Sequence, residues 1–247
     1  MTQQDELVLV GGEVVLSYNI YAGPPPVADK AIAFADLEIV IPAVLDQLAG
    51  WLFSSHDDEL TAALLDAGAT MVRHGHTCIR QITGDDVTLS PRPTNFELSP
   101  ITASTTELAE LSLAAYIDGH VDFDATYDPS AELEDLFAGR ILGPYLAQAS
   151  FQVVDDGCVV GAIIVNDRIG DPPYIGPWVS EIFRDRNARY RGLGSVLLES
   201  SIQSLAQQRR ETLGLVVTNG NPASTLYERT GFNRVLSARK LLIPAST

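Results

Sequence analysis

Residues 95–247 alternate strand-like and helix-like segments, and their order predicts an α/β (α+β) fold with a mixed sheet and helices on both faces. The stripe of Leu197, Leu198, Ile202 and Leu205 indicates an amphipathic helix. A tight turn at 155–157 indicates a hairpin. In order, the predicted segments are a strand (96–101), two helices (106–119, 130–141), the hairpin (149–167), a strand (176–185), a helix (192–208), a strand (212–218), a helix (221–231) and closing strands (232–244).

A polar stretch with two prolines, residues 84–95, predicts a boundary between two parts. We expect a smaller α/β N-terminal subdomain at 1–85, a linker at 86–94 and the main domain at 95–247. Within the smaller part the pattern predicts a hairpin around Gly11-Gly12, two helices and a closing strand. The helices are expected at 41–53 and 58–68, and the strand at 69–82.

The two parts contain a weak internal repeat. Matching Gly68 to Gly231 aligns two segments that each read as a helix, a glycine stop and a strand. Where the second copy has Tyr227, the first has Leu64. The smaller part is therefore interpreted as a degenerate relative of the C-terminal half of the main domain.

The acidic composition argues against some partners. Sixteen Lys and Arg residues against 32 Asp and Glu residues give a net charge of −16, so the chain repels nucleic acid and anionic membranes. No basic leader is apparent, and no apolar run reaches the ~18 residues that span a bilayer. We expect no nucleic-acid partner, no membrane association and a cytoplasmic location.

The residues that commonly bind metals are sparse. Cys78 and Cys158 lie far apart in apolar, strand-like settings, which predicts buried thiols. His74 and His76 form a pair without a third ligand nearby, so no metal site is expected.

The heptapeptide Arg189–Ser195, RYRGLGS, follows an apolar run and opens the helical stretch. The first N–H groups of a helix lack helical partners, and its dipole places about half a positive charge there. Gly192 and Gly194 allow close backbone approach, and Arg189 and Arg191 add charge. These features predict a pyrophosphate site. An ordinary tight turn or a solvated basic spot would also fit the pattern.

This segment also resembles a known family motif. R-x-x-G-x-G after a strand is similar to the acetyl-CoA motif of the GNAT superfamily of N-acetyltransferases, [QR]-x-x-G-x-[GA]. Further along, NPASTLYERTGF resembles the family's second signature, N-x-x-A-x-x-L-Y-x-x-x-G-F, with the alanine shifted by one. The resemblance covers residues 95–243 and implies a GNAT-like central sheet. The sequence departs from the family in having Arg186 for a frequent proline and Tyr190 for a frequent glycine.

The resemblance implies roles for individual residues, with acetyl-CoA as co-substrate. The backbone amides expected to hold the CoA pyrophosphate are those of Arg189, Arg191, Gly192, Gly194 and Ser195. The backbone expected to pair with the pantetheine arm is that of Ile182, Phe183 and Arg184. Asn221 is expected to contact the cofactor near the pantetheine.

Two further residues are expected to be catalytic. Tyr227 would donate a proton to the departing thiolate, as a phenol with a pKa near 10 can; a packed helix aromatic is the alternative. Glu181 would accept the proton of the attacking ammonium through water. Glu181 lies eight residues before Arg189, whereas the base in the family often lies an odd number of residues before it. A β-bulge in this strand would correct the difference. The alternative is a glutamate that faces solvent.

The predicted function is acetyl-CoA-dependent N-acetyltransferase, with direct attack of a primary amine in a ternary complex. The alternative is a catalytically silent, acyl-CoA-binding sensor or scaffold. The acceptor is expected to be a small-molecule or peptide amine, and a loop with Asp122 and Asp124 would suit a cationic one. Residues 1–85 would either close over the acceptor or mediate a homodimer.

Overall fold

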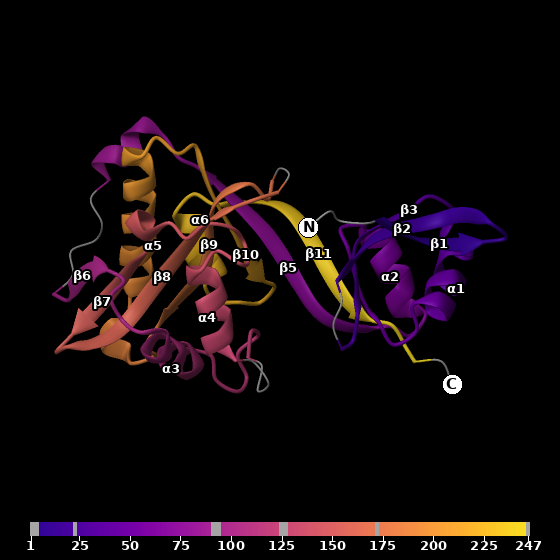
Figure 1. The fold of residues 1–247 in the computed structure, drawn as a ribbon, viewed down its shortest axis with the longest axis horizontal. Coiled ribbons are helices and arrows are strands. Elements are labelled where there is room, and N and C mark those ends of the chain that lie inside the picture. Colours follow the sequence, from indigo (N-terminus) through magenta and orange to yellow (C-terminus); the bar gives the residue numbers. More distant parts are fainter. Residues whose placement is uncertain (1–4, 22–23, 90–94, 124–127, 171–172, 246–247) are drawn as a thin grey trace. The chain divides into compact units, whose positions relative to one another are not determined.

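The computed structural model describes residues 5–21, 24–89, 95–123, 128–170 and 173–245 (Figure 1). It divides into two compact units, here called the first unit (1–76 and 236–247) and the second unit (77–235). The division differs from the predicted one because two long strands, β5 (Thr70–Gln81) and β11 (Asn233–Leu242), each pass from one unit into the other.

The predicted linker begins with ordered structure. Residues Gly84–Thr88 form a 3₁₀ turn in which Asp86 is buried and paired with Arg80. Residues 90–94 lie outside the described residues.

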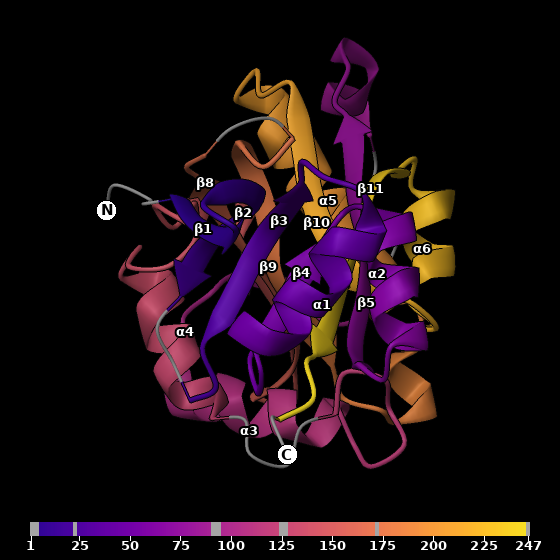
Figure 2. The same cartoon turned by 90° about the vertical axis from the view of Figure 1, so that its right-hand side faces the viewer.

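The first unit has the strand order β1-β2-β3-β4-β11. Its own strands are β1 (Asp5–Val10), β2 (Glu13–Tyr21), β3 (Val27–Ala33) and β4 (Leu52–Ser55), and its helices are α1 (Leu37–Gln47) and α2 (Asp58–Asp66). Figure 2 shows α1 and α2 side by side against this sheet. Their buried faces share one core with the strands, centred on Leu16, Val44, Phe53 and Leu60.

The predicted hairpin at Gly11-Gly12 is confirmed, but the helix predicted at 41–53 is wrong at both ends. The helix α1 begins four residues earlier, at Leu37, and contains Pro42. Gly50 then adopts a left-handed φ of +77°, and the apolar residues after it form β4 instead of more helix. Strand β3 was not predicted.

The second unit has the strand order β5-β10-β9-β8-β7-β6. β9 and β10 are parallel, whereas β6 to β9 form an antiparallel meander, which confirms the predicted mixed sheet. The strands are β6 (Glu97–Pro100), β7 (Phe151–Asp155), β8 (Cys158–Arg168), β9 (Gly176–Arg184) and β10 (Thr212–Thr218). The helices are α3 (Thr105–Ala115), α4 (Pro129–Phe137), α5 (Leu193–Gln207) and α6 (Ser224–Arg229).

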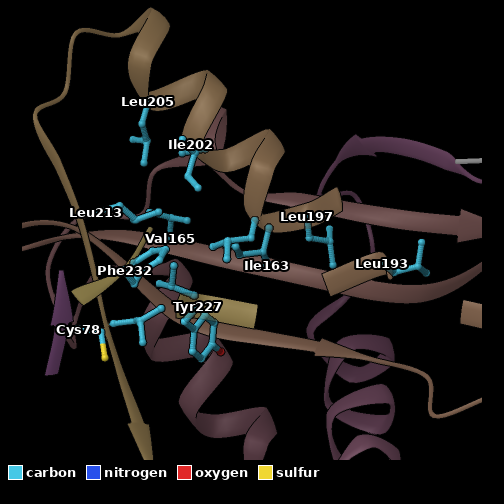
Figure 3. Close-up of a cluster of buried hydrophobic side chains, with 14 of the residues drawn as sticks. Cys78, Ile163, Val165, Leu193, Leu197, Ile202, Leu205, Leu213, Tyr227 and Phe232 are labelled. Atoms are coloured by element: carbon cyan, nitrogen blue, oxygen red, sulfur yellow. The ribbon is translucent and has the colours of Figure 1, made fainter. Parts of the chain in front are cut away.

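The two faces of this sheet have separate cores. Figure 3 shows the α5 side, where Leu197 of α5 lies near Ile163 of β8, and Leu193 and Val165 belong to the same cluster. The intervening β8 residue Ile164 points to the opposite face and packs in a cluster with residues of α3 and α4. This period-two alternation fixes the faces that Ile163, Ile164 and Val165 of β8 occupy.

The structure confirms the hairpin predicted at 149–167 and one of the two predicted buried thiols. Asp156 and Gly157 have φ of +50° and +80°, as a two-residue turn between antiparallel strands requires. Cys78 is buried as predicted, but Cys158 is exposed. It is the first residue after this turn.

The internal repeat is present in the structure. Helix α2 is followed by Gly68 with φ +101° and then β5, and helix α6 is followed by Gly231 with φ +86° and then β11. Left-handed glycines commonly end helices. The two copies therefore share the same helix, stop and strand.

Candidate active site

Helix α5 begins at a left-handed residue. Gly192 is its N-cap, with φ +92°, and a Cβ there would meet no atom within 4 Å. This glycine is thus required by its backbone angle. At Gly194, a Cβ would come within 3.2 Å of Leu226 Cδ2. The second glycine therefore lets α6 pack against the first turn of α5.

Three consecutive backbone N–H groups at this helix start have no hydrogen-bond partner among the described residues: those of Gly192, Leu193 and Gly194. The flanking amides of Arg189, Arg191 and Ser195 donate to acceptors in residues 187–192. Two of the five predicted amides are thus unpaired. Leu193 was missed, although its place in the first helical turn was a signal that could have found it.

The Arg189 side chain turns to the β7–β8 hairpin. Its guanidinium pairs with the Asp155 carboxylate, which also accepts a hydrogen bond of 2.8 Å from the Tyr190 hydroxyl. That hydrogen bond is the main cause of the raised pKa of Tyr190. The Arg189 guanidinium also lies 5.9 Å from the Phe96 ring centroid. Arg189 and Tyr190 therefore anchor the loop to the sheet.

Arg191 supplies an unpaired charge at the same place. Its side chain is exposed and makes no ion pair with the described residues. Arg184 donates a hydrogen bond of 2.5 Å to the carbonyl oxygen of Asp185, its neighbour. Arg191 therefore adds positive charge at the start of α5.

Strand β9 is open along part of one edge. It pairs with β10 in parallel register at Trp178 and Gly214, where a Cβ on the glycine would lie 2.4 Å from the indole. Within the described part of the chain, no paired residues follow toward the end of β9. The two strands thus diverge on the side where α5 begins.

The hydrogen-bonding direction of β9 shows which residues face that edge. The Asp185 N–H donates to the Val160 carbonyl of β8 at 2.9 Å. Because such pairs alternate along antiparallel strands, the backbone of Phe183 also faces β8. The backbone groups of Ile182 and Arg184 face the open edge instead. Of the three residues predicted to pair with a ligand strand, these two are so placed.

Glu181 lies on a bulged part of β9. Ile164 pairs with Glu181, but the next residue, Val165, pairs with Val179, which leaves Ser180 as an extra residue. A bulge is therefore present in this strand, as predicted, but it precedes Glu181 and leaves the spacing from Glu181 to Arg189 unchanged. Glu181 is half-buried and shares the face of its partner Ile164.

Tyr227 lies within the α5-side core, beside Phe232 and Cys78 (Figure 3). Its ring is 6.0 Å from that of Phe232, and only 7% of the residue is exposed. The hydroxyl makes no hydrogen bond with the described residues. The hydroxyl oxygen is not fully buried either, because Arg80 Nε is the one fully buried side-chain polar atom without a partner among the described residues. Tyr227 thus presents an unpaired hydroxyl at the edge of a buried ring.

Two carboxylates lie near that hydroxyl. Burial is the main cause of the raised pKa of Tyr227, and the charges of Glu181 and Asp122 raise it further. The phenol is consequently protonated throughout the physiological pH range. The charge of Glu181 thus acts on the Tyr227 hydroxyl.

Asn221 and Thr218 are held by Asp122. The Asn221 amide donates to Asp122 Oδ2 at 2.6 Å and accepts from the Ala223 N–H at 2.7 Å. The Thr218 hydroxyl donates to the other Asp122 oxygen. Asp122 therefore ties the loop after α3 to the end of β10. Asp124, the other predicted acidic residue, lies outside the described residues.

The same loop contacts β9. The Tyr116 hydroxyl donates to the Ile182 carbonyl at 3.3 Å, and the ring of Tyr116 stands edge-on to His120 at 5.1 Å. His120 Nδ1 accepts the Asp122 N–H at 3.1 Å. The loop thus spans the gap between β9 and β10.

A cavity of about 160 Å³ adjoins Tyr227. Its lining residues are Cys78, Val217, Ser224, Tyr227, Glu228, Phe232, Asn233 and Arg234. Among the described residues, no group of three or more His, Cys, Asp or Glu side chains is arranged to hold a metal ion. In the same part of the chain, no helix combines the length and apolar character needed to cross a bilayer.

Comparison with known proteins agrees with this geometry. Residues 178–240, from β9 to β11, match the sequence profile of a family described as FR47-like protein. A search of curated protein sequences gave no match. A GCN5-related N-acetyltransferase from Sphaerobacter thermophilus is similar in structure, with a TM-score of 0.65 at 13% identity over 96% of this chain and 79% of that one. This chain has the GNAT fold.

Two more GNAT structures support the same conclusion. A GCN5-related N-acetyltransferase from Kribbella flavida has a TM-score of 0.56 at 15% identity, over 99% of this chain and 90% of that one. A tandem GNAT protein of the clavulanic acid biosynthesis pathway has a TM-score of 0.61 at 13% identity, over 98% and 83%. The predicted resemblance to the GNAT superfamily is confirmed. At these identities the likeness establishes the fold, and function has to be argued from the site.

Proposed function

We propose that the protein is an acetyl-CoA-dependent N-acetyltransferase that moves an acetyl group to a primary amine by direct attack in a ternary complex. The observation that supports this best is the run of three unpaired amides at the start of α5, next to the open edge of β9. The unpaired amides suit a pyrophosphate, and the open strand edge suits an extended chain with amide groups. CoA contains both features in this order.

The residues at the helix start fit the pyrophosphate. The N–H groups of Gly192, Leu193 and Gly194 and the helix dipole favour an anion. Arg191 adds an exposed guanidinium. Arg189 would contribute through its backbone position alone, since its side chain is paired with Asp155.

The end of β9 fits the pantetheine arm. The backbone groups of Ile182 and Arg184 face the gap and would pair with its amides in the manner of an added strand. The Ile182 carbonyl already accepts from the Tyr116 hydroxyl, so its N–H is the group expected to serve the ligand. Asn221 would act through the loop it orders, because its amide is bonded to Asp122 and Ala223.

When bound, acetyl-CoA would supply an activated thioester carbonyl. Glu181, on the opposite face from the α5 core, would accept the proton of the attacking ammonium through water. Tyr227 would donate its hydroxyl hydrogen to the leaving sulfur, and the second proton lost by the acetylated nitrogen would restore the phenol. The burial that keeps Tyr227 protonated also makes a phenolate costly, which favours a hydrogen bond over lasting ionisation. The acceptor proposed for this reaction is a small-molecule or peptide amine.

Calorimetric titration with acetyl-CoA, free CoA and ATP tests the binding part. We expect micromolar dissociation constants for both CoA species and much weaker binding of ATP, which lacks the pantetheine arm. An amine panel read by thiol release then tests transfer. Absence of binding by either CoA species would overturn the proposal. Binding without transfer to any amine would instead favour a sensor or scaffold.

The role of Tyr227 has a matched control. Tyr227→Phe should lower turnover by roughly 10²-fold or more while leaving acetyl-CoA affinity unchanged. Tyr18 in the first unit is also buried, with 8% exposed, and Tyr18→Phe should leave turnover unaltered. Equal turnover in the two variants would remove Tyr227 from the mechanism.

A further inference from the structure

The bulge in β9 determines which face of the sheet Glu181 occupies. Val179 pairs with Val165, and both belong to the α5-side core. In a regular strand, Glu181 would share the face of Val179, because side chains two residues apart point the same way. The extra residue Ser180 reverses this, so that Glu181 pairs with Ile164 on the α3 and α4 side.

The bulge is held by one buried side chain on the neighbouring strand. Asn166 of β8 is 0% exposed. Its carbonyl oxygen accepts a hydrogen bond of 2.7 Å from the Ser180 hydroxyl. Its amide nitrogen donates to the carbonyl oxygens of Leu136 at 2.8 Å and Gly143 at 2.9 Å. Asn166 thus links the extra residue of β9 to the end of α4 and to the loop that follows it.

This arrangement leaves little freedom at Ser180. Both hydrogens of the Asn166 amide and its oxygen are used, and each partner is a backbone group except Ser180. A buried amide that lost one of these partners would keep an unsatisfied polar atom, which is costly. The hydroxyl of Ser180 is therefore fixed against a rigid support. Bulges near active sites re-aim adjacent side chains in this way.

We propose that Asn166 and Ser180 are positioning residues, which hold the β9 bulge and so direct Glu181 toward the α3 and α4 face of the sheet. The proposal rests on the function proposed above, in which Glu181 accepts the proton of the amine. Neither residue touches the reacting atoms. Their effect is exerted through the geometry of β9.

Substitution at Ser180 tests the proposal kinetically. Ser180→Ala removes the hydroxyl and should lower kcat about tenfold, since small misplacements of a reacting group are costly, with KM for acetyl-CoA unchanged. Ser180→Thr retains a hydroxyl and should restore most of kcat. The matched control is Ser201→Ala. Ser201 is buried in α5, and its hydroxyl also makes a 2.7 Å hydrogen bond, to the Ala149 carbonyl; its loss should leave kcat unchanged.

Hydrogen exchange gives a readout that needs no activity. In Ser180→Ala, the amides of residues 176–184 should exchange several-fold faster than in the unaltered protein, because the bulge has lost its support. In Ser201→Ala, exchange in this segment should be unchanged.

The outcomes separate the two proposals. Unchanged kcat in Ser180→Ala, in a protein that is active when unaltered, overturns the positioning role alone. So does a kcat loss of equal size in Ser201→Ala, or unchanged exchange in 176–184. If the unaltered protein binds no CoA and acetylates no amine, the proposed function is overturned and the catalytic half of this inference with it. Faster exchange would then still establish that Ser180 supports the bulge.

Discussion

The guanidinium of Arg80 donates a hydrogen bond of 2.6 Å to the carbonyl oxygen of Thr230, at the C-terminal end of α6. The same group pairs with the buried Asp86. Helix α6 has six residues, too few to be stable alone, and it contains Tyr227. A cation at its C-terminus is favourable for the helix dipole. Strand β5 thus supports the helix on which the proposed acid lies.

Removing this support should destabilise the protein. Arg80→Ala removes the cation paired with the buried Asp86 carboxylate and the donor to the Thr230 carbonyl, and we expect the free energy of unfolding to fall by about 1–3 kcal/mol. Urea unfolding measures it. Arg140→Ala is the control, because Arg140 pairs with Asp135 at an exposed site and such pairs contribute less than about 1 kcal/mol. Equal losses would show that Arg80 acts only as a surface charge.

Gly192 should matter for both the backbone and the ligand. Gly192→Ala places a Cβ at φ +92° and should cost about 1–2 kcal/mol of stability. Gly12 has nearly the same φ, +89°, with equally open surroundings, so Gly12→Ala should cost a similar amount. Calorimetry should show weaker acetyl-CoA binding only in Gly192→Ala. Equal affinity in both variants would argue against an anion site at the start of α5.

Tyr227 should affect stability at high pH. Burial raises its pKa above the ordinary value of 10, so the folded state retains a proton that the unfolded state releases first. The stabilisation is full below pH 10 and is lost as the pH rises further. Unfolding measured from pH 9 to 11 should therefore show a shallower decline in Tyr227→Phe. Identical slopes would indicate an ordinary pKa.

The two thiols should differ in reactivity. Cys158 is exposed, whereas burial raises the pKa of Cys78 and shields it from reagents. A thiol reagent should modify one cysteine per native chain, and both only after unfolding. Cys158→Ser should abolish the native reaction. Rapid modification of Cys78 in the folded protein would show that the core around Tyr227 opens readily.

The second unit was largely predictable because its signals are local. Strand alternation, the Asp-Gly turn and the helical stripe starting near Gly192 each depend on neighbouring residues. The first unit was less so. Residues 51–53 look like helix by apolarity, and only the left-handed Gly50 and the strand partners of β4 decide otherwise.

The candidate site shows the same contrast. The sequence indicates the glycines of the helix start and the need for a bulge near Glu181. It does not indicate that Arg189 pairs with Asp155, that Asp122 holds Asn221, or that Asn166 supports Ser180. Those partners lie far apart along the chain, and their contacts depend on the tertiary fold.

The passage of β5 and β11 between the units also bears on how the protein can be divided. A fragment that began at Asn95, the predicted domain start, would lack β5 and with it Cys78 and Arg80, which belong to the second unit. The first unit likewise needs the last residues of the chain. Neither half is an autonomous cassette, so gene fusion, shuffling or truncation at the polar stretch should give incomplete sheets.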